Sequence, residues 1–181
     1  MMKPIRPRRR TPLYPTAFLA SALILVFAGC SSAPDAPDRV VETRNLAARH
    51  VQFGNDYFRQ GNYTQAMYFY RLALDGHRSV DHEPGVASTL NAIGKVHIER
   101  EEWDAARSAF EESREISRRI GEDATLLQSI NNLGELALRR GEPAAAAPLF
   151  EEAAAMAEES GDSGERAIVL HNLATARLRT D

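Results

Sequence analysis

Apolar positions recur every three or four residues over most of this chain, which is the spacing of one face of an α-helix. Leu90, Ile93 and Gly94 follow this spacing in one segment, and Ala106 and Phe110 follow it in the next. Short breaks rich in Gly, Asn and Glu separate the segments, and none shows the period-two alternation typical of a β-strand. The pattern therefore predicts an all-α protein whose helices are joined by short turns.

The helical pattern itself repeats with a period of 40 residues. The first helix of each unit has a small residue at one fixed position, and the second helix has an alanine followed four residues later by an aromatic residue. These positions are Gly54, Gly94, Gly134 and Ala174 on the first helices, and Ala66–Tyr70, Ala106–Phe110 and Ala146–Phe150 on the second helices. We expect the small residues to allow close approach of the helices and the rings to fill the space between them. A constant period of this length predicts stacked helix pairs.

The motifs at these positions resemble tetratricopeptide repeats. The stretch INNLG at residues 130–134 and the pattern Gly-x-aromatic-x-x-Ala-x-x-x-aromatic-x-x-Ala at residues 61–73 are similar to those of the family. The unit of 40 residues exceeds the family's usual ~34 and resembles the longer repeats of the kinesin light chain class. From Leu46 to the C-terminus, the resemblance implies a right-handed α-solenoid of three full repeats and a C-terminal capping helix. We expect Leu170, Leu173 and Ala174 of that helix to face the third repeat.

Residues 1–29 resemble a bacterial lipoprotein signal peptide. Basic residues precede an apolar run at residues 17–28 that is too short to span a bilayer comfortably. The run ends in FAGC, which is similar to a lipobox, the motif in which a signal peptidase leaves the cysteine as a new, lipid-bearing N-terminus. Cys30 is therefore the predicted lipidation (palmitate) site, and the alternative is an uncleaved N-terminal anchor with an incidental cysteine.

The expected order of segments is a signal peptide, a tether and one folded domain. Residues 30–37 are polar and interrupted by proline, which is typical of a flexible tether, and residues 38–181 form the repeat domain. In Gram-negative lipoproteins an Asp after the lipidated cysteine favours retention in the inner membrane, and Ser31 stands there in this chain. By this resemblance the protein is expected in the outer membrane, lipid-anchored and facing the periplasm.

Charge and composition exclude several functions. Residues 30–181 hold all 25 acidic residues and 17 of the 22 basic ones, so they are poorly suited to bind nucleic acid. The five histidines form no pair at the i, i+4 spacing of a metal motif, and Cys30 is the only cysteine. No nucleophile stands near a base at a meaningful spacing, and paired acids fall on solvated helix faces. We therefore predict no metal, no cofactor, no small-molecule substrate and no enzymatic activity.

The concave groove of such a solenoid is the predicted binding surface, because in this family the first helices of successive repeats line it. Aligned by their glycines, these helices carry three rows: Val51, Asn91, Asn131 and His171; Asn55, Lys95, Glu135 and Thr175; and Phe58, Ile98, Leu138 and Leu178. Amides beside an apolar row suit an extended peptide, since an amide donates and accepts hydrogen bonds. The alternative is that Asn91 and Asn131 are only solvated and that the apolar row is packed inside the superhelix. The predicted partner-binding residues are Asn55, Phe58, Asn91, Lys95, Asn131 and Glu135, together with Tyr68 and Phe69, which are surplus aromatic residues of the first repeat.

Some family members grip the C-terminal carboxylate of chaperones with a clamp of Lys, Asn, Asn, Lys and Arg. Of the five matching positions here, only Asn55 carries the residue of the clamp, so a chaperone-tail clamp is not predicted.

The predicted function is a membrane-anchored adaptor or scaffold in the bacterial envelope that binds a protein or peptide segment in its groove. Pilus, secretion and cell-wall assembly are the processes that this resemblance suggests. Two alternatives remain open: a structural spacer that self-associates into homo-oligomers, and a non-catalytic accessory subunit of an envelope enzyme. The predicted binding site is either the concave groove or the surface formed by the aromatic residues of the first repeat.

Overall fold

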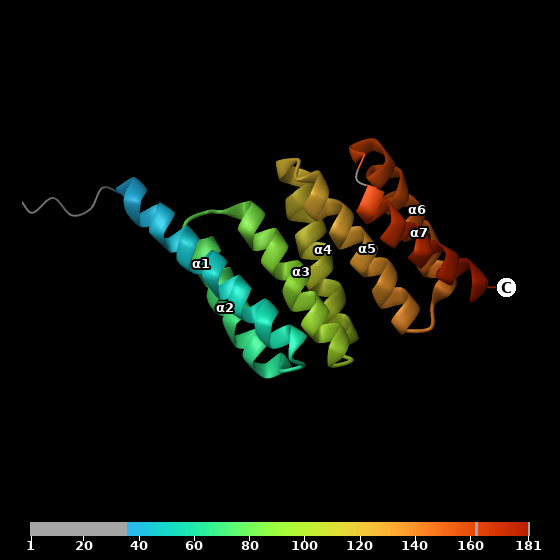
Figure 1. Cartoon of the computed structure of the whole chain (residues 1–181), viewed down its shortest axis with the longest axis horizontal. Coiled ribbons are helices and arrows are strands. Elements are labelled where there is room, and N and C mark those ends of the chain that lie inside the picture. The colour runs from blue at the N-terminus through green and yellow to red at the C-terminus, as the bar shows by residue number, and fades with distance from the viewer. Residues whose placement is uncertain (1–35, 162, 181) are drawn as a thin grey trace, which may run out of the picture. The chain divides into compact units, whose positions relative to one another are not determined.

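The computed structural model describes residues 36–161 and 163–180, and it contains seven α-helices and no strand in these ranges. The helices are α1 (Ala36–Arg59), α2 (Tyr63–Ser79), α3 (Glu83–Glu99), α4 (Trp103–Ile120), α5 (Asp123–Arg139), α6 (Pro143–Ser160) and α7 (Ser163–Leu178), as Figure 1 shows. The predicted signal peptide and Cys30 lie outside the described residues, and α1 begins inside the predicted tether. None of the helices in the described part of the chain is long and apolar enough to cross a membrane.

The helices of the unit Pro34–Asp181 form antiparallel pairs that stack in chain order (Figure 1). α1 pairs with α2, α3 with α4 and α5 with α6. Successive pairs are joined because α2 packs on α3, α4 packs on α5 and α6 packs on α7. The backbones of the first helices of successive units, α1, α3, α5 and α7, also approach one another closely, whereas the second helices lie farther apart and are joined by the ion pairs Arg78–Glu112 and Arg118–Glu152. The first helices therefore lie on the inner side of the stack, and the prediction of an all-α solenoid of helix pairs is confirmed.

The repeated glycines lie directly beneath the repeated aromatic rings. A Cβ atom added to Gly134 would lie 2.6 Å from Cε1 of Phe150, and Gly54 and Gly94 face Tyr70 and Phe110 in the same way. Each of the three rings is at most 2% exposed. The predicted close approach of the paired helices is confirmed, because no side chain larger than hydrogen fits between glycine and ring.

The turns between helices use residues with positive φ at a fixed repeat position. Gly61 and Gly141 have φ of 72° and 76°, and Glu101, at the same repeat position, has φ of 59°. A left-handed conformation costs a residue with a side chain about 1–2 kcal/mol, whereas glycine adopts it freely. The turn at Glu101 therefore has the same left-handed conformation as the two glycine turns but carries backbone strain.

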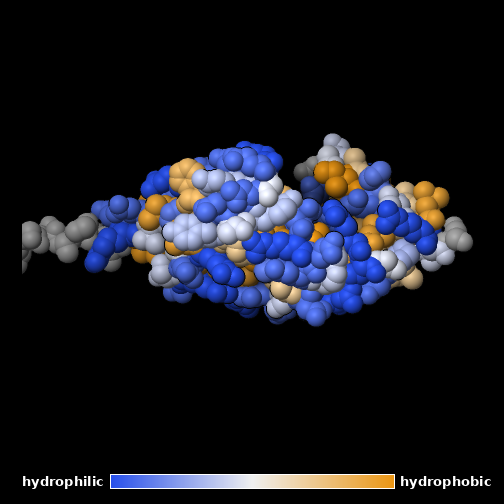
Figure 2. All heavy atoms as spheres, turned by 90° about the horizontal axis from the view of Figure 1, so that it is seen from below, coloured by the Kyte–Doolittle hydropathy of each residue, from blue (hydrophilic) through white to orange (hydrophobic). Residues whose placement is uncertain are grey.

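The last helix packs on the third repeat through a different line of residues from the one predicted. Val169, Leu173 and Ala176 are buried against α5 and α6, whereas Leu170 is 43% exposed and Ala174 is also exposed. The prediction is right for Leu173 and wrong for Leu170 and Ala174, because the latter two lie on the side of α7 where a second helix of the unit would pack. Figure 2 shows hydrophobic side chains on the surface near this end of the unit, among mostly hydrophilic neighbours.

Candidate functional site

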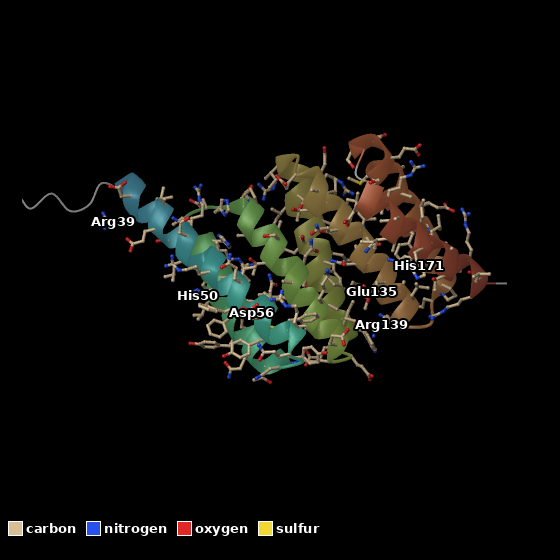
Figure 3. All side chains as sticks on the ribbon, viewed as in Figure 1. Arg39, His50, Asp56, Glu135, Arg139 and His171 are labelled. Atoms are coloured by element: carbon tan, nitrogen blue, oxygen red, sulfur yellow. The ribbon has the colours of Figure 1, made fainter. Side chains whose placement is uncertain are left out.

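The first helices carry polar side chains, of which Figure 3 labels Asp56 on α1 and Glu135 and Arg139 on α5. The Glu135 carboxylate lies 3.5 Å from the Arg139 guanidinium, which in turn lies 3.4 Å from the Glu99 carboxylate on α3. The single cation Arg139 therefore compensates only part of the charge of the two carboxylates at the end of α3 and α5. Glu135, a predicted partner-binding residue, is thus already engaged in an ion pair.

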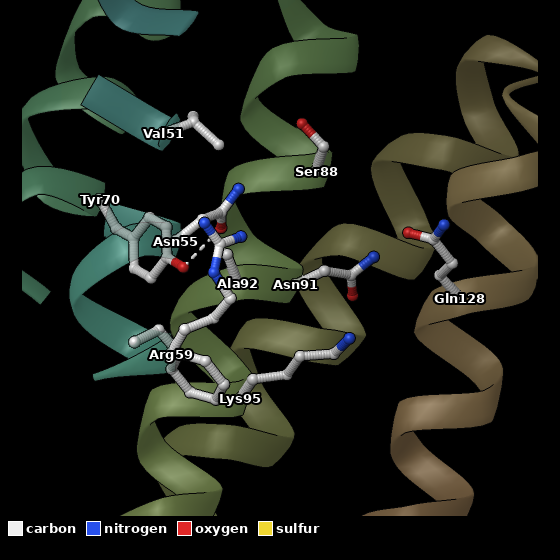
Figure 4. Close-up of a pocket in the computed structure, with 10 residues that line it drawn as sticks. Val51, Asn55, Arg59, Tyr70, Ser88, Asn91, Ala92, Lys95 and Gln128 are labelled. Carbon is white, nitrogen blue, oxygen red and sulfur yellow. Dashed lines mark hydrogen bonds between the residues drawn. The ribbon is translucent and has the colours of Figure 1, made fainter. Parts of the chain in front are cut away.

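A pocket of about 320 Å³ opens on the inner side between α1, α3 and α5 (Figure 4). All but one of its lining residues come from first helices, and the exception, Tyr70, comes from α2. The lining residues are Val51, Asn55, Phe58, Arg59, Tyr70, Ser88, Asn91, Ala92, Lys95 and Gln128. The pocket brings together four predicted site residues, Asn55, Phe58, Asn91 and Lys95, and excludes Asn131, Glu135, Tyr68 and Phe69.

Two cations border this pocket. Lys95 of α3 is exposed, and the side chain of Arg59 of α1 is 74% exposed and forms an ion pair with Asp56. Figure 4 shows the Lys95 ammonium on the side of the pocket that faces α5 and the Arg59 guanidinium beside Asn55. The formal charge of the chain is −3, so a pocket flanked by two cations is locally opposite in sign to the whole chain.

The Tyr70 hydroxyl orients Asn55 at the wall of the pocket. It donates a hydrogen bond of 2.7 Å to Oδ1 of Asn55. Burial raises the pKa of Tyr70 to about 12, although the Arg59 charge acts in the opposite direction, so the phenol stays protonated and remains a donor. With its oxygen engaged, Asn55 offers a ligand its NH2 group, which suits a carbonyl or carboxylate oxygen.

Asn91 and Asn131 are buried rather than solvated. Asn91 is 4% exposed and its Nδ2 donates to the backbone oxygen of Thr125 at 3.4 Å. Asn131 is 9% exposed and its Oδ1 accepts from Nδ2 of Asn172 at 3.0 Å. The expectation of open amides in this row is wrong because the first helices of neighbouring repeats contact each other along it. Both side chains join one repeat to the next.

The third row is mostly packed, and only Leu178, at its far end, is largely exposed, at 79%. Ile98 is 3% exposed and packs with Phe110 in the core, and Leu138 packs against the core of the third repeat. Phe58 is half-buried, and its ring lies 5.6 Å from that of Tyr63. The alternative of a packed apolar row therefore holds for Ile98 and Leu138, and only Phe58 contributes to the pocket.

Six lining residues were not among the predicted site residues: Val51, Arg59, Tyr70, Ser88, Ala92 and Gln128. Arg59 lies one helical turn after Asn55, so the helical spacing alone could have indicated it. Ser88 and Gln128 share one repeat position, one turn before the row that contains Asn91. Polar residues at this same position in two successive repeats could have indicated that the position belongs to a binding surface.

The surplus aromatic residues of the first repeat form a cluster outside the pocket. The Phe69 ring of α2 lies 5.4 Å from Phe53, 5.5 Å from Tyr57 in a stacked arrangement, and 5.3 Å from Tyr68. Phe53 and Tyr68 are 49% and 56% exposed. Packing against α1 accounts for Phe69, and the role of Tyr68 in partner binding stays a prediction.

Two histidines face each other at the junction of the first and second repeats. Nδ1 of His77 lies 3.1 Å from Nδ1 of His82, and Arg44 is nearby. Burial, the other ring and the Arg44 charge lower the pKa of His77, and burial and Arg44 lower that of His82. Both rings are therefore neutral at pH 7. Over the residues that the structure describes, no three His, Cys, Asp or Glu side chains are grouped so that they could hold a metal ion.

Comparisons with known proteins agree with this architecture. A model of the tetratricopeptide repeat family matches residues 45–119, and a second tetratricopeptide repeat model matches residues 126–160. Among solved structures, the N-terminal domain of stress-induced protein-1 (STI-1) from C. elegans is similar, with 15% identity and a TM-score of 0.53, over 72% of this chain and 96% of that one. A variant of a putative kinesin light chain from Podospora anserina, with nearly identical TPR-like repeats, has 17% identity and a TM-score of 0.57, over 83% of this chain and 70% of that one. Among curated proteins, no sequence matches significantly.

The stacked helix pairs and the pocket on their inner side define a helical-repeat interaction module. The two family matches together cover more than half of the chain, so it belongs to the tetratricopeptide repeat family. Repeats of this family indicate a scaffold for protein–protein interaction.

Proposed function

We propose that this protein is an adaptor that binds an extended peptide with an acidic group in the pocket between α1, α3 and α5. The observation that supports this proposal is the pair of cations, Arg59 and Lys95, beside the oriented amide of Asn55. A carboxylate gains charge-assisted hydrogen bonds from both cations, and such bonds are about twice as strong as neutral ones. The partner is therefore a protein segment that carries Asp, Glu or a free C-terminus.

The pocket also favours an extended backbone. Asn55 and Gln128 stand on opposite walls, on α1 and α5, and each carries an amide that can bond to a peptide group. Phe58 offers an apolar surface for one side chain of the ligand. This arrangement differs from the chaperone-tail clamp, because the cations stand at other positions, and the similarity to the STI-1 domain concerns the fold alone.

The test is enrichment of peptides from two displayed decapeptide libraries that differ only at one fixed position, Glu in one and Gln in the other. We expect the full chain in detergent to enrich the Glu library and the double variant Arg59→Gln, Lys95→Gln to lose about tenfold or more in affinity for the selected peptides, since bonds to charged groups contribute roughly 1.5–3 kcal/mol each. Arg118→Gln, an exposed change on α4, is the matched control. Equal enrichment of the Gln library, or unchanged affinity of the double variant, would contradict the proposal.

We further propose that this adaptor is held at the outer membrane by lipid on Cys30 and faces the periplasm. Its support is the FAGC motif and the Ser31 that follows, which lie outside the described residues. Cys30→Ser should abolish incorporation of radiolabelled palmitate and release the protein from the membrane fraction, because acyl chains supply the affinity for the bilayer. Normal processing and unchanged fractionation of the variant would refute the anchor.

The process served by the adaptor is proposed to be assembly of an envelope structure, such as a pilus, a secretion system or the cell wall. Crosslinking in intact cells, followed by identification of the captured proteins, distinguishes these processes. A spacer that self-associates would instead show concentration-dependent oligomers in sedimentation. An accessory subunit would be captured with one enzyme in fixed proportion.

A further inference from the structure

A second pocket lies beside the pocket between α1, α3 and α5. It has a volume of about 280 Å³ and lies between the start of α5, the end of α6 and the start of α7. Gln128 of α5 lines both pockets, so the two are neighbours along that helix. Figure 4 shows Gln128 on the α5 side of the first pocket. A ligand that reaches Gln128 from the first pocket therefore stands at the edge of the second.

The charged side chains that line the two pockets have opposite signs. In the first pocket they are Arg59 and Lys95. In the second they are Asp123 and Glu165. Arg166, which follows Glu165 in the chain, forms an ion pair with a glutamate of α6 at 3.6 Å and does not line the pocket. Neighbouring surfaces of opposite charge are complementary to a ligand that carries both an acidic and a basic group.

The second pocket also has an apolar wall. Leu127 of α5 is 4% exposed, and Met156 of α6 packs against the core cluster that contains Leu127. A lysine or arginine side chain combines an apolar stem with a charged end. Its stem fits against these two side chains while its charge meets the two carboxylates. Pockets for whole drug-sized ligands measure about 300–1,000 Å³, so a pocket of this size suits one long side chain.

Two sequence differences between the second and third repeats account for the space and its charge. Ile120 and Ser160 share one repeat position, and Thr125 and Glu165 share another. Ile120 is half-buried at the end of α4. The shorter side chain of Ser160 bonds to a backbone oxygen of its own helix and leaves space that an isoleucine would fill. The third repeat thus has both more room and an added carboxylate, and the two together favour a long cationic side chain.

We propose that the pocket between α5, α6 and α7 is a subsite for a lysine or arginine side chain of the same extended peptide whose acidic group binds between α1, α3 and α5. This inference rests on the proposed function and adds a second requirement to its ligand. Asp123 stands five residues before Gln128, which is about 7.5 Å along the axis of α5. An extended peptide advances about 3.3 Å per residue, so the basic residue is expected two or three positions beyond the residue that contacts Gln128.

The test uses two displayed decapeptide libraries that differ only at one fixed position, Lys in one and Gln in the other. We expect the full chain in detergent to enrich the Lys library. Ser160→Ile fills the pocket and Asp123→Lys reverses its charge, so each should weaken binding of the selected peptides about fivefold or more. The matched control is Asp104→Lys, the same charge change in the first turn of α4, at a fully exposed side chain that lines neither pocket. It has the same effect on a helix dipole and should leave binding unchanged.

A further measurement asks whether one peptide occupies both pockets. The selected Lys peptides are titrated against the double variant Arg59→Gln, Lys95→Gln. A loss of affinity supports the inference, whereas unchanged affinity would mean that the pockets take separate ligands and would overturn it.

The remaining outcomes also decide the inference. Equal enrichment of the Lys and Gln libraries overturns it, as does unchanged binding by a folded Ser160→Ile or Asp123→Lys variant, or an equal loss in Asp104→Lys. Thermal melting shows which variants are folded, and the two pocket variants act by different means, so either one is sufficient. The proposed function is decided separately by the Glu and Gln libraries, so the failure of one is distinguishable from the failure of the other.

Discussion

Gly94→Leu should destabilise the domain, because Gly94 lies under the Phe110 ring. A Cβ atom added at this position would lie 2.7 Å from both Cδ1 and Cζ of that ring. Carbon atoms prefer a separation of about 3.5–4.0 Å, so the ring would have to move by roughly 1 Å. The ring is 0% exposed and packs with Ile98 and Leu136, so its neighbours would have to move with it.

Overpacking of this kind costs about 1–3 kcal/mol. In a domain of this size each kcal/mol lowers the melting temperature by roughly 2–5 °C, so we expect a decrease of about 2–15 °C. The assay is thermal unfolding followed by circular dichroism at 222 nm. The matched control is Ala174→Leu, the same repeat position on α7 with no covering helix, and it should leave the melting temperature almost unchanged.

A double-mutant cycle separates the ring contact from other effects of the substitution. Gly94→Ala adds only the clashing methyl group, and Phe110→Leu removes part of the ring that it meets. The double variant should lose less stability than the sum of the two single variants, by about 1 kcal/mol, because the smaller side chain makes room for the methyl group. Additive losses, or an unchanged melting temperature for Gly94→Leu, would refute the contact between glycine and ring.

Three further changes test other parts of the structure by the same melting assay. Asn131→Ala should cost about 1 kcal/mol because it breaks the bond from Asn172 across the repeat junction, and an unchanged melting temperature would mean that the amide is solvated after all. Glu101→Gly should raise stability by about 1 kcal/mol because glycine relieves the positive φ, and a loss would show that the turn is unstrained. His77 and His82 have lowered pKa values in the folded state, so the unfolded chain binds more protons and stability should fall as the pH drops below the ordinary value of 6.5. A variant with Gln at both positions should show a flatter pH profile between about pH 7.5 and 5.5, and an equally steep profile would assign the effect to other groups.

The sequence alone determined the architecture of each helix pair. The 40-residue period marked the units, and the small residue on one helix with the aromatic residue on the next predicted the contact that Gly134 makes with Phe150. These features depend on positions within one hairpin, where helical spacing and a short turn leave little freedom. Part of the candidate site followed as well, since Asn55 and Lys95 share a repeat position and both line the pocket.

Only the tertiary structure decided which of the three residue rows on the first helices is accessible to a ligand. Asn91 and Asn131 occupy an inner position by spacing, yet both are buried in the contacts between neighbouring first helices. Arg59 shares a helix face with Asn55 by spacing, but the packing of α1 beside α3 decides that it borders the pocket together with Lys95. A helical period determines which residues share a face of one helix. The distance and angle to the next repeat determine whether that face is open or buried, and both depend on side-chain packing along the whole junction. For the same reason Leu170 and Leu178 have the helical spacing of core residues in the sequence and are exposed in the structure.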